Sequence, residues 1–176
     1  MRKLSLLAGL VLALGLAAGA YALAGKKGDN SGGKLIGFSE VPANSTTGVG
    51  EFRLEIQSND RISYRLTYRA LEAAAAAAHI HLGQRDVNGG VAAFLCGGGN
   101  KPGCPATEGT VNGIIVPSDV IGPSGQGIDA GQFAELVRAI RAGRTYANVH
   151  TSKFPGGEIR GQIGGVKKKD GDDKKD

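Results

Sequence analysis

Apolar and polar residues alternate along much of the chain. In residues 50–56, Phe52, Leu54 and Ile56 fall on one side of an extended backbone, and charged residues fall on the other. A second run, residues 62–68, alternates in the same way after a short polar turn. A period of two is typical of a half-buried strand, so the two runs predict an antiparallel hairpin with one solvent-facing side.

Five other segments have the length and composition of strands. Most hold a short apolar run that glycine, proline or polar residues bound. They are residues 34–38, 79–83, 91–95, 109–116 and 158–163. About seven short strands predict a mainly β protein, and we expect an antiparallel Greek-key β-sandwich of the immunoglobulin type.

One segment carries conflicting signals. Residues 73–78 are all alanine, the best helix former. A run this short does not nucleate a stable helix unaided, and the next residues, 79–83, alternate like a strand. We therefore expect the alanines to form a loop or a single turn that leads into that strand.

A later connection has the period of an amphipathic helix. The apolar positions of this period are Phe133, Leu136, Val137 and Ile140. Asp129 is the predicted N-cap, and Gln132 completes a capping box. Arg138 and Arg141 suit the C-terminal end of the helix dipole, and Gly143 suits a left-handed cap. We expect this one helix to pack on the strands and cover the core.

The N-terminal segment has the features of a secretory signal peptide. Two basic residues precede a long apolar run that ends in a small-x-small site, so residues 1–24 are predicted to be cleaved after Ala24. The alternative is an uncleaved anchor, because ~20 apolar residues can span a bilayer. After cleavage we expect no transmembrane domain and a secreted, extracellular or cell-envelope protein.

Two further segments lie outside the predicted domain of residues 34–166. Residues 25–33 are predicted to be a linker. Residues 167–176 hold only lysine, aspartate and one glycine, and a segment without apolar residues is predicted to be a disordered charged tail.

The composition is that of an ordinary globular chain. Of the 176 residues, 41% are hydrophobic and 21% charged, and the 30 glycines show no collagen repeat. These values exclude a disordered chain and a coiled coil. Much of the formal net charge of +5 comes from the two ends, and no basic stripe interleaves with aromatic residues. We therefore expect no nucleic-acid partner.

Cys96 and Cys104 are the only cysteines. An even number of cysteines in an exported chain favours a disulfide, and the glycine-rich segment between them allows a sharp return of the backbone. The alternative, a metal site, has less support because the spacing is not that of a C-x2-C motif. We predict a structural disulfide bond.

Four segments resemble the CHRD (chordin-type) domain family. They are residues 37–42 (GFSEVP), 78–83 (AHIHLG), 143–151 (GRTYANVHT) and 156–162 (GGEIRGQ). In this order and spacing they extend over most of the chain that follows the leader. The resemblance implies an exported β-sandwich domain of undefined biochemical activity. An extracellular or cell-envelope role in binding or structure, with an extracellular protein or envelope component as partner, is the function it favours.

All three histidines lie in these segments. His79 and His81 are two residues apart in a predicted strand, so they share one face at a spacing of ~7 Å. His150 ends another apolar segment, which the fold can bring alongside. Three imidazoles on one face suit copper or zinc. The sequence thus offers a second function: a mononuclear copper or zinc protein, with redox activity as an extension.

A second resemblance concerns the same residues. The His-x-His strand and the later Gly-Arg-Thr-x-x-x-x-His segment before a Gly-Gly turn look like parts of the copper–zinc superoxide dismutases, which are Greek-key sandwiches. This resemblance places His79, His81 and His150 where three copper ligands lie. The chain departs from that family in having no histidine for a bridging ligand and no zinc-binding cluster, and Glu158 takes the place of a guiding arginine. These departures argue against dismutase activity.

The histidines also admit a purely structural interpretation. They would hydrogen-bond backbone carbonyls at strand ends, with Asn148, Thr151 and Glu158 completing a polar network. Glu158 and Arg160 lie two residues apart in one strand and are interpreted as a surface ion pair. The motifs of serine hydrolases, P-loops and dinucleotide-binding folds are absent, so the sequence identifies no catalytic residue and favours a protein that is not an enzyme.

Overall fold

The computed structural model describes residues 29–57 and 60–164, which form eight strands, three short 3-10 helices and one α-helix. The strands are β1 (Asp29–Ile36), β2 (Val49–Gln57), β3 (Arg61–Arg69), β4 (Ala75–Leu82), β5 (Val91–Cys96), β6 (Gly109–Ile115), β7 (Thr145–Thr151) and β8 (Ile159–Ile163). The helices are η1 (Gly37–Ser39), η2 (Pro117–Asp119), η3 (Ser124–Gln126) and α1 (Phe133–Arg141). The prediction of a mainly β protein with one helix in a late connection is confirmed.

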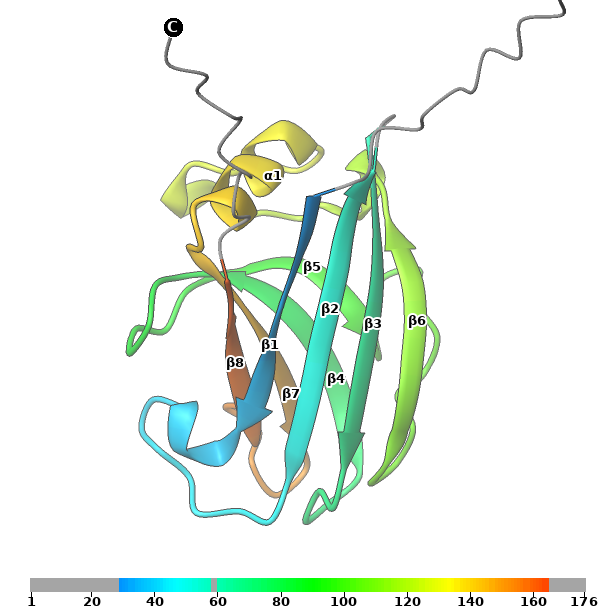
Figure 1. Ribbon diagram of the computed structural model, residues 1–176, viewed down its shortest axis with the longest axis vertical. Coiled ribbons are helices and arrows are strands. Elements are labelled where there is room, and N and C mark those ends of the chain that lie inside the picture. The colour runs from blue at the N-terminus through cyan, green and yellow to red at the C-terminus, as the bar shows by residue number, and fades with distance from the viewer. Residues whose placement is uncertain (1–28, 58–59, 165–176) are drawn as a thin grey trace, which may run out of the picture.

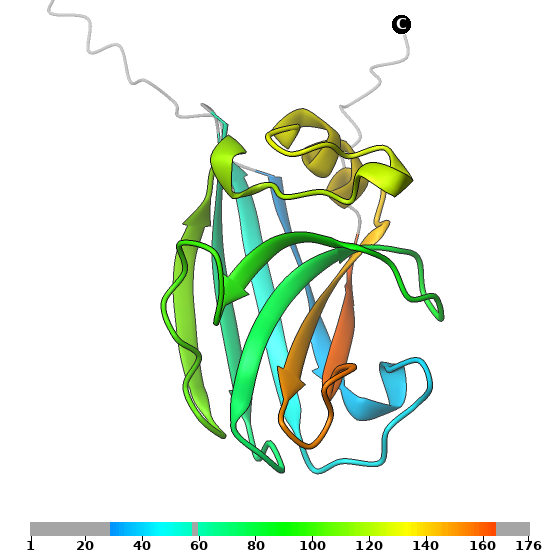
Figure 2. The same ribbon diagram turned by 180° about the vertical axis from the view of Figure 1, so that it is seen from behind.

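Hydrogen bonds join all eight strands into one antiparallel sheet in the order β5-β4-β7-β8-β1-β2-β3-β6. The sheet curls on itself, so that β4 and β5 lie behind β2 and β3 (Figures 1 and 2). The sheet is nearly but not fully closed: β5 and β6 are its two edge strands, and they do not pair with each other. The sequence led us to expect a two-sheet sandwich, whereas the strands form one continuous sheet. Alternation predicts half-buried strands in both arrangements and does not distinguish them.

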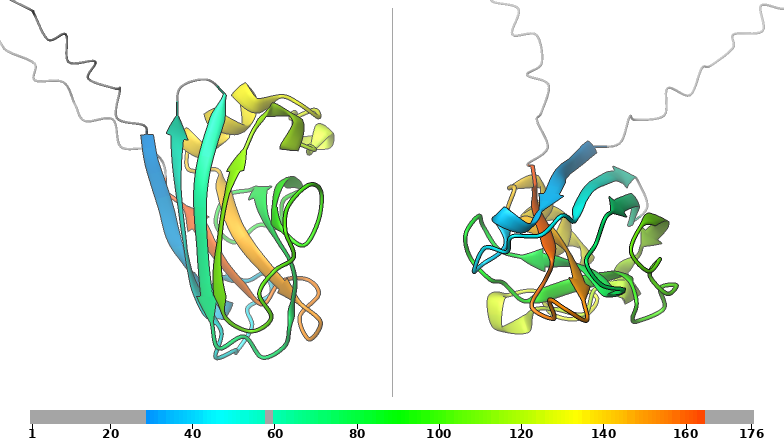
Figure 3. Two further views of the ribbon diagram at one scale, coloured as in Figure 1. Left: turned by 90° about the vertical axis from the view of Figure 1, so that its right-hand side faces the viewer. Right: turned by 90° about the horizontal axis from the view of Figure 1, so that it is seen from below.

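The core side chains pack on the inner face of this curled sheet. The view from below shows how the sheet curves (Figure 3). The hairpin of β2 and β3 is confirmed, and its residues Phe52, Leu54 and Ile56 are buried as predicted. Burying large apolar side chains on one side of each strand supplies the main stabilising free energy, since each contributes about 1.5–3 kcal/mol.

Helix α1 covers one end of the sheet (Figure 1). Its four predicted apolar residues are buried, and Gly143 after it has the left-handed conformation (φ 65°) expected of the cap. The predicted N-cap, Asp129, is wrong: the cap is Gln132, and the helix begins at Phe133. The Gln132 side chain still accepts a hydrogen bond from the Asp129 amide (2.9 Å), which is half of a capping box displaced from the helix itself.

The expectation for the alanine run is partly wrong. Strand β4 begins at Ala75, so four of the alanines lie in the strand rather than in a loop or turn. Ala77 pairs with His150, and Ala78 pairs with Val149. These ladder contacts with β7 outweigh the helical propensity of alanine, which is a local and small effect.

The segments predicted to lie outside the domain are the linker, the signal peptide and the charged tail. Strand β1 includes residues 29–33, which composition assigned to a linker, and these residues pair with β2. The predicted signal peptide (residues 1–24) and charged tail (residues 167–176) lie outside the described residues. Among the residues that are described, no helix has both the length and the apolar character needed to cross a membrane.

The predicted disulfide between Cys96 and Cys104 is confirmed, with the two Cα atoms 5.1 Å apart. The disulfide closes the loop of residues 97–103, which follows β5 and lies next to β6. From this loop the Lys101 ammonium donates to the Ile114 carbonyl of β6 (2.6 Å). The loop therefore bridges the two strands at which the sheet is not closed.

Candidate metal centre

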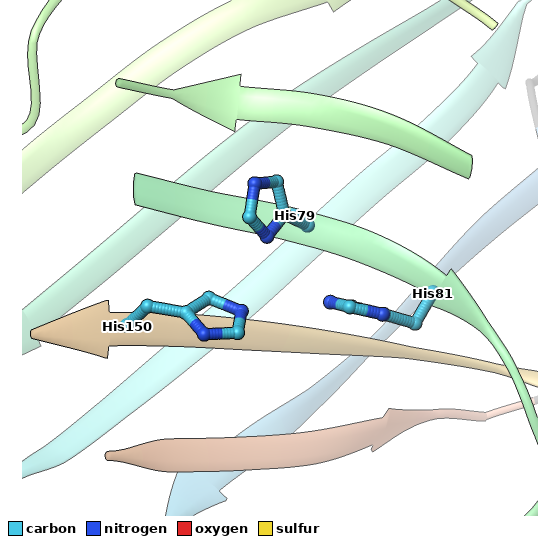
Figure 4. A group of neighbouring side chains, drawn as sticks. All are labelled: His79, His81 and His150. Carbon is cyan, nitrogen blue, oxygen red and sulfur yellow. The ribbon is translucent and has the colours of Figure 1, made fainter. Parts of the chain in front are cut away.

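The three histidines come from two neighbouring strands. Strands β4 and β7 pair antiparallel, and His81 lies opposite Tyr146 while His150 lies opposite Ala77. The side chains of Ala78 and Ile80 point into the core, so the alternation of β4 turns His79 and His81 to the outer face. His150 projects from β7 on the same face, and the three rings approach one another (Figure 4).

The imidazoles converge on one point. One nitrogen from each of the three residues lies within 4.8 Å of the other two. Atoms this close share a central point at most about 2.8 Å from each, whereas zinc–nitrogen bonds measure about 2.0–2.1 Å. A ring movement of less than ~1 Å would thus complete a three-histidine metal site. The three side chains that the sequence analysis names as candidate ligands thus lie around one common point.

Backbone carbonyls fix which nitrogen faces the centre in two of the rings. The Nδ1 of His81 lies 3.0 Å from the Gly89 carbonyl, and the Nδ1 of His150 lies 2.9 Å from the Pro155 carbonyl. A carbonyl only accepts, so in each neutral ring Nδ1 carries the proton and Nε2 keeps a free lone pair. Metal-binding histidines are held in the same manner.

The nitrogens at the centre lack hydrogen-bond partners. Across the described residues, four buried side-chain nitrogen or oxygen atoms have none, and three of them are His79 Nδ1, His81 Nε2 and His150 Nε2. The fourth is Thr145 Oγ1. Leaving a buried polar atom unpaired costs about 1–3 kcal/mol. Three such costs at a single point need an explanation, and a bound metal ion would remove all three.

The three rings are held in the neutral form that metal binding requires. Burial lowers the pKa of His79 to about 3, with smaller contributions from His150 and His81. Burial also lowers the pKa of His81 to about 4, although the hydrogen bond to Gly89 opposes this shift. The pKa of His150 is lowered for the same main reason. No proton therefore competes for these lone pairs near neutral pH.

Aromatic side chains enclose the cluster. Phe94 of β5 meets His79 edge to face, with ring centroids 4.6 Å apart. Tyr146 stacks on His81 with its ring nearly parallel, at 4.8 Å. The guanidinium of Arg160 lies over the Tyr146 ring, 4.4 Å from its centre. These contacts restrict the rotamers of the two β4 histidines.

The predicted polar residues bond to one another and to Glu40 beside the histidines, not to the imidazole rings. Asn148 donates to Glu40 (2.6 Å), and Arg160 donates to the other oxygen of Glu40 (3.0 Å). Thr151 donates to Glu158 (2.8 Å). Asn148, Thr151 and Glu158 therefore form contacts separate from the free imidazole nitrogens, while the bonds of His81 and His150 to the Gly89 and Pro155 carbonyls are of the kind that the structural interpretation predicts.

The predicted surface ion pair between Glu158 and Arg160 is wrong. Both residues are buried, at 0% and 4% exposure, and Arg160 forms its ion pair with Glu40. The carboxylate of Glu158 instead accepts hydrogen bonds from Thr46 and Thr151. Spacing within one strand did not reveal that residues from a distant loop cover this face.

Sequence reasoning missed the residues that hold the histidines in place. The Gly89 and Pro155 carbonyls act through the backbone, so no side-chain pattern marks them. Phe94 was identified only as part of a strand. Glu40 belongs to the segment 37–42, whose resemblance to a known family was the one available signal for it.

Comparison with known proteins identifies one match. The family model of the CHRD domain matches residues 33–163, which include all the residues of the cluster. No curated protein and no solved structure matches the chain.

Proposed function

The chain belongs to the CHRD domain family, and we propose that it binds a single copper or zinc ion through His79, His81 and His150. The observation that carries this proposal is the convergence of three unpaired, buried imidazole nitrogens. Histidines that serve only to hold strands together would have partners for both ring nitrogens. Here His81 and His150 each satisfy one nitrogen and direct the other at the centre.

The donor set suits either metal. Imidazole nitrogen is a ligand for both copper and zinc, and three histidines with an open fourth position form a known zinc arrangement. His79 would bind through Nδ1, and His81 and His150 through Nε2. The metal would supply Lewis acidity, or in the case of copper one-electron chemistry, while the protein supplies the fixed, neutral imidazoles.

The proposal includes export of the protein. The disulfide supports it, because such bonds persist in oxidising compartments outside the cytoplasm. The sequence of residues 1–24 supports export independently, because it has the features of a cleavable signal peptide. In this setting the domain would serve as a metal-binding module that meets an extracellular protein or a component of the cell envelope.

Titration of the metal-free protein with Cu(II) and, separately, Zn(II) tests the proposed function. We expect one ion per chain in the wild type, and an affinity at least about a hundredfold lower in His81→Ala, because one of three ligands is lost. Gln84→Ala, in the exposed loop after β4, is the matched control and should bind as the wild type does. Circular dichroism checks that each variant is folded. Absence of binding by the wild type, or equal binding by His81→Ala, would refute the site.

A further inference from the structure

The donor atoms of the centre are all neutral. The group of potential ligands that the structure brings together consists of three histidines, with no carboxylate or thiolate among them. The two cysteines of the chain are joined in the disulfide and supply no thiolate. A metal ion bound here would keep its whole positive charge, since no ligand neutralises any of it.

Among the described residues, no acidic side chain around the centre belongs to the group of potential ligands. Glu40 is paired with Arg160 and Asn148, and the Glu158 carboxylate accepts hydrogen bonds from the Thr46 and Thr151 hydroxyls. Glu72 pairs with Lys153 at the neighbouring turn. Arg160 is the charged group of these that packs against the cluster: its guanidinium lies 4.4 Å from the centre of the Tyr146 ring, which stacks on His81.

These conditions discriminate between ions of different charge. The free-energy cost of transferring an ion out of water rises with the square of its charge, so a divalent ion pays about four times as much as a monovalent one of similar size. Three donors also satisfy the coordination of a monovalent copper ion, whereas zinc takes a fourth.

We propose that the centre holds copper as the monovalent cuprous ion in preference to cupric copper and zinc. This inference rests on the proposed function and names the metal and its oxidation state. The observation behind it is a buried site of three neutral imidazoles without a carboxylate, with the Arg160 guanidinium packed on the Tyr146 ring that stacks on His81.

The reduction potential of copper bound to the full-length protein tests the preference directly. A potential above that of the aqueous Cu(II)/Cu(I) couple means, by the thermodynamic cycle, that the cuprous ion binds more tightly than the cupric ion. We expect such a potential, equivalent to at least about a tenfold ratio of dissociation constants. One equivalent of cuprous ion, delivered anaerobically from a weak chelator, should also displace bound zinc.

A matched pair of variants tests the cause. Ala77 lies opposite His150 on the same face, where paired Cβ atoms are ~4.5–5.5 Å apart. Ala77→Glu adds a carboxylate beside the centre, and Ala77→Gln adds the same shape without the charge. Relative to glutamine, glutamate should lower the copper potential and raise zinc affinity at least about tenfold, because it neutralises part of the excess charge of the divalent ion.

The outcomes separate this inference from the proposed function. If the wild type binds no metal, the proposed function fails. If it binds metal with a copper potential at or below that of the aqueous couple, or retains zinc against cuprous ion, the metal site stands and the preference is refuted. Equal potentials and zinc affinities in Ala77→Glu and Ala77→Gln would also overturn the electrostatic argument. The wild-type measurements hold whether or not either variant folds.

Discussion

At the scale of single residues, the neutral state of the histidines links the centre to the stability of the fold. Burial lowers the pKa of His79 to about 3 and that of His81 to about 4, whereas a histidine in an unfolded chain titrates near ~6.5. Between these values the unfolded chain binds more protons than the folded one. Acid therefore favours unfolding over this range, and the stability of the metal-free protein falls as the pH is lowered.

We predict that the unfolding free energy of the metal-free protein decreases steadily from about pH 7 to pH 4. His79→Phe removes one of the groups responsible and should give a shallower decrease. Urea unfolding in the presence of a chelator, at a series of pH values, measures both. Gln84→Ala serves as the control and should follow the wild type. Parallel curves for the wild type and His79→Phe would show that His79 is not held neutral by the fold.

Residue spacing predicted part of the cluster for a simple reason. His79 and His81 are two apart in a strand, so their sharing of a face follows from strand geometry alone. Their approach to His150 follows from the pairing of β4 with β7, which no local pattern specifies. Glu40 and Arg160 are 120 positions apart, and neither carries a sequence signal for the other. Long-range partners of this type were therefore missed.

At the scale of elements, the loop between β4 and β5 is part of the centre. The Gly89 carbonyl accepts the hydrogen bond of His81, and the Gly89 amide donates to the Tyr146 hydroxyl (3.1 Å). Arg160 donates to the Val87 carbonyl and to Asn88 of the same loop. The loop thus contacts His81 through the Gly89 carbonyl, and it contacts Tyr146, whose ring stacks on His81, through the Gly89 amide.

We predict that Gly89→Ala lowers metal affinity about ten- to a hundredfold, because partners of this type typically have effects of that size. A Cβ at position 89 would come within 1.7 Å of the Leu82 carbonyl oxygen, so the backbone must move and take the acceptor of His81 with it. Gly125→Ala is the control, since a Cβ there meets nothing within 4 Å. Metal titration compares the two. Unchanged affinity in folded Gly89→Ala would mean that this carbonyl does not orient His81.

The elements themselves were predictable where periodicity and propensity agree. The period of α1 and the alternation of β2 and β3 predicted those elements and their buried faces. In β4 the alanine run favoured helix locally, while the strand depends on partners on both sides. Sequence analysis underestimated this strand because the pairing free energy comes from segments far along the chain.

At the scale of the whole molecule, closure of the sheet depends on contacts other than strand pairing. The Tyr64 hydroxyl of β3 donates to the Leu95 carbonyl of β5 (2.7 Å), and the disulfide loop after β5 reaches β6 through Lys101. Lys101 also pairs with Asp119, and both side chains are about nine-tenths buried. The disulfide holds this loop in place.

We predict that the double variant Cys96→Ala/Cys104→Ala loses about 2–3 kcal/mol of unfolding free energy, as expected for a short closed loop. Metal affinity should stay within about twofold of the wild type, because neither sulfur atom belongs to the histidine group. Denaturant unfolding and metal titration measure the two effects separately. A large loss of affinity would show that the loop supports the centre through Phe94.

The single curled sheet was beyond sequence reasoning for a physical reason. Each strand has one buried face whether its neighbours form one sheet or two, so the alternation is the same. The deciding contact is the junction of β8 with β1, where Ile36 pairs with Arg160. This pairing joins two segments that are far apart in the sequence, and no local sequence pattern predicts that they pair.

The opposite orientations of successive residues in β4 have an evolutionary consequence. Ala78 and Ile80 pack into the core, while His79 and His81, which alternate with them, lie on the opposite face. A mutation at 79 or 81 changes the ligands of the centre and leaves the core side chains in place, whereas a mutation at 78 or 80 does the reverse. Descendants of this scaffold could therefore lose, gain or exchange ligands while inheriting the same architecture, and a shared ancestry would then be a poor guide to shared chemistry.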